Sequence, residues 1–117
     1  MVKNDGNDFA KFKVAYALNK LLQKNKKIYE RNRKQGIEDL LLDHSFDRIA
    51  SRTGLRIATI SEVFNGKVDP KISTISLILQ SLGVNYSGFG KLIDSLTDAE
   101  AKAYMDTKLP SKKIRTK

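Results

Sequence analysis

Residues 45–67 read SFDRIASRTGLRIATISEVFNGK and contain two short apolar patterns of helical period. The first pattern follows Ser45, a suitable N-cap, and ends at Gly54, where a left-handed C-cap favours glycine. The second begins at Arg56 and ends at Asn65-Gly66. The residues expected to face the core are Phe46, Ile49 and Ala50 in the first helix and Ile60, Val63 and Phe64 in the second. Two helices joined by a short glycine-containing turn are therefore predicted here.

Two further helical patterns follow this pair. After a connector at residues 67–70, Ser73 is placed to cap a helix that ends at Gly83, and another helix is expected over residues 86–96. Their apolar positions are Ile75, Ile78, Leu79 and Leu82, then Phe89, Leu92, Ile93 and Leu96. No run alternates apolar and polar residues over the length of a strand. The chain is therefore predicted to be all-α.

The first 44 residues contain a long helical pattern and a basic segment. Residues 1–8 show no periodicity and are expected to be flexible, and Asp8 is placed to cap the helix that follows. Residues 20–34 include seven basic residues and one acid, so this part is either the exposed end of the helix or a solvated loop. Gly36 is placed to stop the helix. A short further helix, ending near Asp43, is indicated by Ile37, Leu40 and Leu41.

The expected organisation is a single domain with appendages. It comprises a flexible N-terminus at residues 1–8, a helical segment with the basic stretch at residues 9–44, a helical core at residues 45–96 and a basic C-terminal tail at residues 97–117. The whole is predicted to be a bundle of about five helices with an extended or inserted basic N-terminal segment.

The composition indicates a folded, basic protein. The chain has 117 residues, of which 40% are hydrophobic, with 22 Lys+Arg, 13 Asp+Glu and a formal net charge of +9. This apolar fraction is too high for a disordered polyelectrolyte, so the excess positive charge is expected on the surface of a folded domain. A polyanion is the partner that such a charge favours.

Few residues are suited to catalysis or to metal binding. Cysteine is absent and His44 is the only histidine, which excludes disulfides, thiolate sites and two-histidine metal sites. His44 is expected to be a solvated residue just before a helix, and Asp39 and Asp43 are expected to be surface charges on one helix face. No phosphate-binding loop or dinucleotide fingerprint occurs. No catalytic residue, metal site, cofactor or small-molecule ligand is therefore predicted.

The sequence shows no pattern of a targeting or membrane segment. The longest unbroken apolar run is Val14–Leu18, which is far shorter than a signal-peptide core or a membrane span. A soluble cytoplasmic protein without membrane contact is therefore expected.

The segment from Ser45 to Lys67 resembles the core of the lambda repressor, Cro and XRE family of bacterial and phage regulators. The matching motifs are an aliphatic-Ala pair, a Gly-aliphatic turn, an Ile-Ser step and a closing Phe-Asn-Gly turn, present here as Ile49-Ala50, Gly54-Leu55, Ile60-Ser61 and Phe64-Asn65-Gly66. Residues 71–84, KISTISLILQSLGV, are similar to the fourth helix of the family. The resemblance covers about residues 45–94. It implies a helix-turn-helix fold, and a cytoplasmic, nucleoid-associated protein of bacterial or phage origin.

The second helix of the pair has the size of a helix that fits the major groove of duplex DNA. The residues expected to point outward from it are Ala58, Thr59, Ser61, Glu62 and Asn65. Ala58 and Ser61 would let the backbone come close to the groove, and the methyl group of Ala58 or Thr59 can meet a thymine methyl. Arg56 can bind a phosphate or a guanine edge. The expected phosphate contacts are Ser45, Asn65 and Lys67, and the resemblance also implies this role for Ser45 and Asn65.

Two positions depart from the family pattern. Phe46 stands where the family often has a glutamine that reaches DNA, and Ile57 stands where a polar base-reading residue is frequent. Both remain candidate DNA-binding residues. Phe46 and Ile57 pack either against the core or against a DNA methyl group. The alternative is that this protein reads bases in a different way from the family.

The resemblance and the outward residues of the second helix predict a sequence-specific regulator of transcription. It is expected to act as a homodimer that represses transcription by occluding a promoter. The dimer surface is expected either on residues 96–105 or on Phe9, Phe12 and Tyr16. The alternative is a protein-interaction module, such as an antitoxin that neutralises an enzyme. A nonspecific RNA or single-strand binder is disfavoured because the outward face carries no aromatic stacking platform. Residues 20–34 and the basic tail are either solvated or act as arms on the DNA backbone or in a minor groove.

Overall fold

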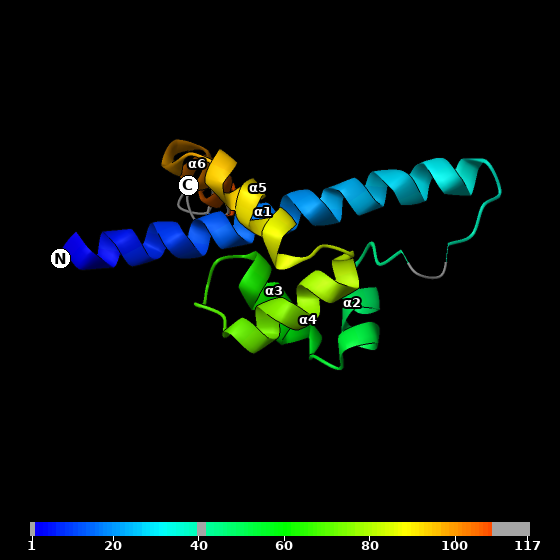
Figure 1. The fold of residues 1–117 in the computed structure, drawn as a ribbon, viewed down its shortest axis with the longest axis horizontal. Coiled ribbons are helices and arrows are strands. Elements are labelled where there is room, and N and C mark those ends of the chain that lie inside the picture. Colours follow the sequence, from blue (N-terminus) through cyan, green and yellow to red (C-terminus); the bar gives the residue numbers. More distant parts are fainter. Residues whose placement is uncertain (1, 40–41, 109–117) are drawn as a thin grey trace, which may run out of the picture.

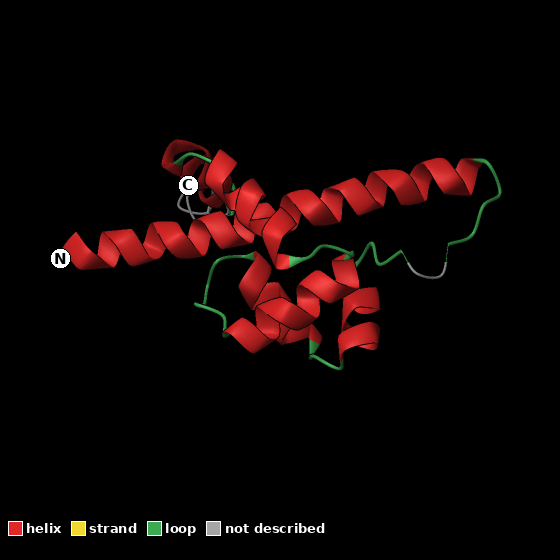
Figure 2. Cartoon of the chain, viewed as in Figure 1, coloured by secondary structure: helices red, strands yellow, loops and turns green. Residues whose placement is uncertain are grey.

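Six α-helices make up the described part of the chain, which comprises residues 2–39 and 42–108, with side chains from residue 10 onward. The structure is a computed structural model, and within these residues it contains no strand (Figures 1 and 2). The helices are α1 (Val2–Lys34), α2 (Phe46–Thr53), α3 (Ile57–Phe64), α4 (Ile72–Leu82), α5 (Tyr86–Ser95) and α6 (Asp98–Asp106). The all-α prediction is confirmed for this part of the chain, with one helix more than expected.

The longest helix, α1, runs past all the others. In Figure 1 the short helices α2, α3 and α4 lie on one side of α1, and α5 and α6 lie on the other. The core forms where α1 passes between these two groups. Its buried residues are Ala17, Leu18, Leu22, Ile49, Ile60, Val63, Phe64, Ile75, Ile78, Leu79, Leu82, Phe89 and Leu96. The apolar positions predicted for residues 45–96 all lie in this core or pack against it, because helical periodicity reports which side of a helix is buried.

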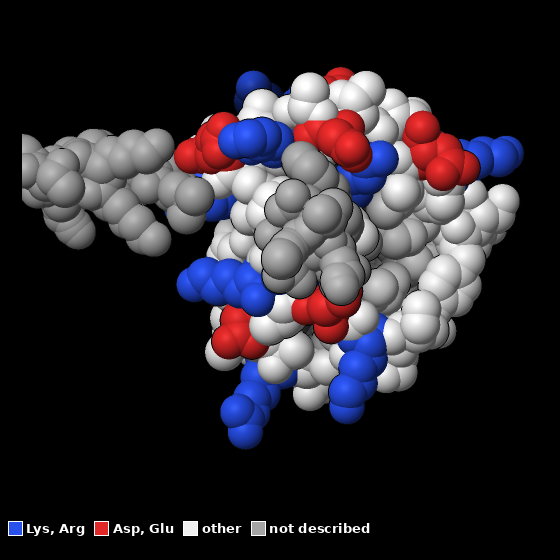
Figure 3. All heavy atoms as spheres, turned by 90° about the vertical axis from the view of Figure 1, so that its left-hand side faces the viewer, with Lys and Arg blue, Asp and Glu red and all other residues white. Residues whose placement is uncertain are grey.

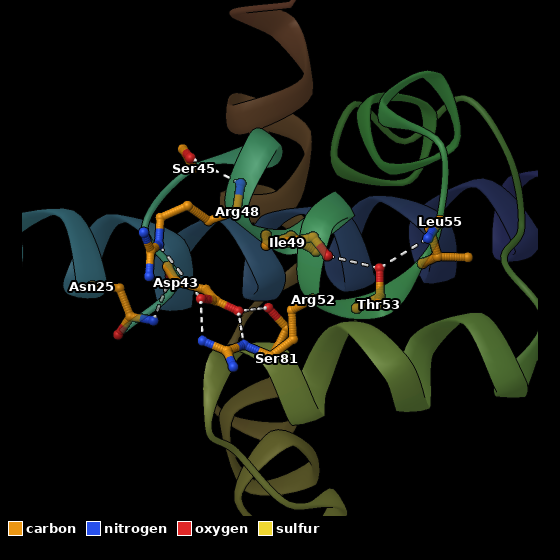
Figure 4. Close-up of polar contacts among 9 residues, drawn as sticks. All are labelled: Asn25, Asp43, Ser45, Arg48, Ile49, Arg52, Thr53, Leu55 and Ser81. Atoms are coloured by element: carbon orange, nitrogen blue, oxygen red, sulfur yellow. Dashed lines mark hydrogen bonds and ion pairs between the residues drawn. The ribbon is translucent and has the colours of Figure 1, made fainter. Parts of the chain in front are cut away.

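Local hydrogen bonds hold the start of α2 and the turn from α2 into α3. Ser45 caps α2 as predicted, and its Oγ accepts a hydrogen bond from a backbone N–H of the first turn at 3.2 Å. Gly54 ends α2 with a φ of 82°, a left-handed conformation that favours glycine. The Thr53 hydroxyl donates to the Ile49 carbonyl at 2.7 Å and accepts from the Leu55 N–H at 3.1 Å (Figure 4). The path of the chain from α2 into α3 is therefore defined by its own sequence.

The predicted start of α4 is wrong by two residues. The helix begins at Ile72, and the extended residue before it is Lys71, whose side chain forms no cap hydrogen bond. Ser73 therefore lies inside the first turn instead of capping it. A serine acts as an N-cap only where its own backbone is still extended, and here the chain has already turned into the helix.

The N-terminal prediction is also corrected. The structure begins α1 at Val2, so residues 2–8 are helical and Asp8 lies within the helix instead of capping it. Apolar periodicity reports burial and not helicity, so its absence from residues 1–8 did not exclude a helix.

The basic segment is the exposed end of α1 and not a loop. α1 continues to Lys34, and Gly36 follows with a φ of 73°, as predicted for the residue that stops the helix. We expected a short further helix ending near Asp43, but residues 37–39 and 42–43 are not helical, so this prediction is wrong for the described residues. Leu40 and Leu41 lie outside them.

The sixth helix, α6, lies in the segment that we expected to be a basic tail. The Thr97 hydroxyl accepts from the Glu100 N–H at 3.0 Å, and the Glu100 carboxylate accepts from the Thr97 N–H at 2.9 Å, which forms a capping box. Ala101 and Met105 are buried against the rest of the protein. The expected tail therefore contains a packed helix, and residues 109–117 lie outside the described residues.

Contacts from α6 complete the C-terminal end of α3. The Tyr104 hydroxyl donates to the Phe64 carbonyl at 3.0 Å, and the Tyr104 ring stacks on Tyr16 of α1 with centroids 5.1 Å apart. Burial raises the pKa of Tyr104 to about 12, so the phenol keeps its proton. A Cβ added at Gly66 would lie 2.8 Å from the Met105 side chain, so α6 packs directly on the turn after α3.

Candidate functional site

One side of α3 is fully buried and the opposite side faces solvent. Ile60, Val63 and Phe64 are 0%, 2% and 1% exposed, as predicted for the inner face. On the predicted outer face Ala58 and Glu62 are exposed, whereas three positions are half-buried: Thr59, Ser61 and Asn65. The helix is therefore anchored by its apolar side, and the side chains of its outer face can reach a partner.

The polar groups on the outer face of α3 interact with each other. The Asn65 side-chain amide donates to the Ser61 hydroxyl at 3.2 Å. A hydroxyl that accepts a hydrogen bond keeps its own proton to donate, and a primary amide has a second N–H and a carbonyl oxygen. Ser61 and Asn65 can therefore present both donors and acceptors to a ligand.

Both ends of α3 carry an exposed cation. Arg56 occupies the N-cap position, where its side chain forms no cap hydrogen bond, and Lys67 follows the turn after the helix. Ile57, in the first turn, is 47% exposed and so does not pack in the core. Phe46 does pack there, because its ring lies against Phe64 with centroids 5.0 Å apart. The two departures from the family pattern therefore have different structural roles.

A shallow hollow of about 400 Å³ lies beside the N-terminus of α2. It is lined by Ser45, by Lys26 of α1 and by Lys108, which follows α6. Asp47 also lines it and adds one carboxylate. The sequence indicated residues 20–34 and the basic tail as possible contacts of the DNA backbone, but no local pattern indicated that Lys26 and Lys108 lie next to Ser45.

A buried residue, Asp43, connects α2 with α4 through its carboxylate and with α1 through its backbone carbonyl (Figure 4). Its oxygens accept hydrogen bonds from Arg52 at 2.7 and 2.9 Å and from the Ser81 hydroxyl at 2.5 Å, and Arg48 lies 3.6 Å away. The Asn25 side-chain amide of α1 donates to the Asp43 carbonyl at 2.9 Å. The prediction that Asp43 is a surface charge is wrong, because its partners come from three separate helices.

The charge of Asp43 is stabilised where it is buried. Burial by itself would raise the pKa of the carboxyl group, but hydrogen bonds from Arg52 and Ser81 and the charges of Arg52 and Arg48 lower it below its ordinary value. The carboxylate is therefore ionised at neutral pH. Because it holds α2 against its neighbours, it also fixes the direction of the α2 N-terminus.

Replacing Asp43 with Asn is expected to lower the free energy of unfolding at pH 7 by about 1–3 kcal/mol, because the two arginines lose their buried anion. A carboxyl group whose pKa is lower in the folded than in the unfolded chain stabilises the fold at pH values above its unfolded-state pKa of about 3.9. This stabilisation is lost as the pH falls through the folded-state pKa. The difference between the two proteins should therefore shrink below about pH 4. Urea unfolding at pH 7 and at low pH measures this, with the exposed Asp94→Asn as control. Equal stability of wild type and Asp43→Asn at pH 7 would contradict the assigned role.

His44 is not the solvated residue that the sequence indicated. Its ring is half-buried and stacks on Tyr29 of α1, with centroids 3.7 Å apart and an angle of 17° between the rings. Burial lowers the pKa of the imidazole, and the nearby charge of Arg48 lowers it further. His44 therefore fastens the segment that leads from α1 to α2.

Charged residues are distributed unevenly. Figure 3 views the molecule from the N-terminal end of α1, and on this face Lys and Arg side chains alternate with Asp and Glu. In contrast, residues 20–34, in the other half of α1, contain seven basic residues and one acid. The strongest positive charge of the described residues is therefore on the second half of α1.

Comparison with known proteins gave no match: no family model, no curated protein and no solved structure is similar to this chain. None of the helices in the described residues is both long enough and apolar enough to cross a membrane. Within the same residues, no three His, Cys, Asp or Glu side chains are grouped so that they could hold a metal ion. The surface of α2 and α3 and the distribution of charge are therefore the features of the molecule that bear on its function.

Proposed function

We propose that this protein is a sequence-specific DNA-binding regulator of transcription, whose α2 and α3 form a helix-turn-helix of the lambda repressor, Cro and XRE type. The observation that carries the proposal is the division of α3 into a fully buried apolar side and an outer side of mostly small residues, which also includes Glu62, with Arg56 and Lys67 at its ends. A helix anchored in this way presents its outer side as a rigid unit, which reading of base edges in the major groove requires.

Four of the five outer residues of α3, all except Glu62, have a role in DNA binding that their chemistry supports, and so does Arg56 at the N-cap. Ala58 and Thr59 are small enough for close approach and carry methyl groups that suit thymine. Ser61 and Asn65 supply donors and acceptors for base edges or phosphates. The guanidinium of Arg56 suits a guanine edge or a phosphate, which it can bind in a bidentate manner.

Phosphate contacts would fix the register of the protein on the duplex. The N-terminus of α2 at Ser45 offers backbone N–H groups and a positive helix dipole. Lys26 and Lys108 add positive charge to the hollow beside Ser45, and Lys67 adds an exposed cation after the C-terminus of α3. These contacts carry no sequence information, so specificity would come from the outer face of α3.

Repression by occlusion is the simplest mechanism for such a protein. A protein bound across a promoter excludes other proteins from that DNA, and this needs neither a ligand nor an effector domain. We therefore assign to it no catalytic step, cofactor or small-molecule ligand. A regulator of this kind acts in the cytoplasm, on the nucleoid of a bacterial host.

The test of this function is selection of bound fragments from the source genome, followed by binding measurements at defined salt. We expect enrichment of a few sites with a shared two-fold motif, and specific affinity that exceeds nonspecific affinity by roughly 10³-fold or more. A basic protein binds any duplex at low salt, so the comparison with random DNA decides the outcome. Recovery of fragments without a common motif would contradict the proposal.

The protein is further expected to bind its operator as a dimer, with the two copies of α3 about 34 Å apart, one turn of DNA. The reason is that a single helix of this length contacts few base pairs. Some residues of the predicted dimer surfaces form contacts inside the protein, since Tyr16 stacks on Tyr104 and Met105 is buried. The side chain of Phe9 lies outside the described residues. Sedimentation of the free protein and of its DNA complex measures the stoichiometry. A monomer in both states would contradict this and would favour the alternative, a protein-interaction module such as an antitoxin.

A further inference from the structure

The second half of α1 extends beyond the core. Asn25 is the last buried residue of α1, and none of residues 26–34 is buried, yet the helix continues to Lys34 (Figure 1). These nine residues add about 13 Å of helix. The segment that returns toward α2 packs on this part through the stack of His44 on Tyr29. Burial of apolar surface therefore does not account for the length of α1.

Five basic residues form one row along this half of α1, which we call the basic stripe. They are Lys20, Lys24, Lys27, Arg31 and Lys34. Their spacing of i, i+4, i+7, i+11 and i+14 places them within an arc of about 80° and over a length of about 21 Å, at 3.6 residues per turn and 1.5 Å per residue. All five are exposed. The stripe is therefore a straight row of cations on the surface.

No carboxylate among the described residues forms an ion pair with the basic stripe. The one acid of the segment, Glu30, lies off the stripe and pairs with Arg33 at 3.1 Å. The Lys20 ammonium lies 5.2 Å from the centre of the Tyr16 ring, which does not neutralise it. Glu30 does line a hollow with Lys27, Arg31 and Lys34, but within the described part of the protein the charge of the stripe is not neutralised by an ion pair.

The basic stripe does not face the same way as the proposed DNA-binding surface. Lys26 lines the hollow beside Ser45, which marks the side of α1 nearest the N-terminus of α2. At 100° per residue the five positions of the stripe lie on average about 120° around the helix from Lys26. A duplex held at Ser45 would therefore meet the side of α1 around Lys26 and leave the far edge of the stripe, at Lys24 and Arg31, open to solvent.

We propose that the basic stripe binds the phosphate backbone of a second segment of duplex DNA, so that the protein bridges two duplexes. The inference rests on the proposed function for the identity of the first duplex. Cations that recur every three or four residues along one face of a helix match a polyanion with regularly repeated charges, and the net charge of +9 favours such a partner. Along the hollow beside the stripe only Tyr16 and Ile28 offer apolar surface, whereas an interfacial membrane helix would need a continuous apolar face.

The test uses the full-length protein bound to an immobilised duplex, to which a fluorescent duplex of random sequence is added. The wild type should retain the fluorescent duplex, and Lys27→Gln/Arg31→Gln should lower this retention roughly tenfold while still binding the immobilised duplex. Removal of two phosphate contacts should flatten the salt dependence of retention by about 1.8 units. The matched control is Lys91→Gln/Lys102→Gln, which loses the same charge from exposed positions on α5 and α6 and should bridge as the wild type does.

Two outcomes would overturn the inference. One is that the wild type retains no second duplex, and the other is that the stripe variant and the control variant bridge equally well. The immobilised duplex is used in operator and random-sequence forms. Loss of operator preference counts against the proposed function alone, because retention of the second duplex by the stripe does not depend on sequence.

Discussion

Replacement of Phe64 by alanine is expected to lower the free energy of unfolding by about 3–5 kcal/mol, the cost of leaving a large cavity in a packed core. Phe64 is 1% exposed, and its ring lies against Phe46. The side chain is also part of the buried side of α3, so its loss weakens the anchoring of the proposed reading helix. Urea unfolding at neutral pH measures the effect.

The matched control for this change is Ile72→Ala. It also removes a large apolar side chain, but Ile72 is 70% exposed, so we expect a change within about 0.5 kcal/mol. If Phe64→Ala unfolded at the same denaturant concentration as the wild type, the assignment of a buried side to α3 would be wrong.

Replacement of Ser61 by glutamate is expected to abolish the preference for the operator over random DNA, a loss of roughly 10³-fold or more in the ratio of the two affinities. Ser61 is half-buried on the outer face and accepts a hydrogen bond from Asn65. A longer, negatively charged side chain at this position would be repelled by phosphates and would prevent close approach of α3 to the bases. Titration of operator and random duplexes measures the ratio, and unfolding of the variant checks that the fold is kept.

Lys67→Ala provides the comparison for Ser61→Glu. If Lys67 contacts a phosphate, its loss should weaken binding to operator and random DNA about equally and flatten the salt slope by about one unit. The two variants therefore separate reading of sequence from attraction of charge. Full operator preference in Ser61→Glu would show that α3 does not lie in the groove.

The parts of the fold that were predicted correctly depend on neighbours in the sequence. Ser45, Gly54 and Gly66 occupy the cap and turn positions that their own backbone preferences indicate, and the buried residues of α3 follow from spacing alone. The capping box at Thr97 and Glu100 also depends only on residues close together in the sequence, but the basic residues that follow it led us to expect a tail. α6 could therefore have been predicted from the sequence.

The contacts that sequence reasoning missed join residues far apart in the chain. Asp43 meets Ser81 and Asn25 only because α4 and α1 converge on it, and no local pattern indicates this. The same holds for Lys26 beside Ser45, since that proximity depends on the path of the chain between α1 and α2. The residues of the proposed reading face were therefore predictable, whereas the groups that orient it were not.

The hydrogen bond from Tyr104 to the Phe64 carbonyl has a consequence for the order in which the protein matures during synthesis. The chain leaves the ribosome from its N-terminus, so α2 and α3 emerge before the tyrosine that completes the end of α3. A chain that has not yet reached residue 104 carries α3 without this bond and without the packing of Met105 beside Gly66. Unfinished chains are therefore expected to hold the proposed reading helix less firmly than the completed protein does.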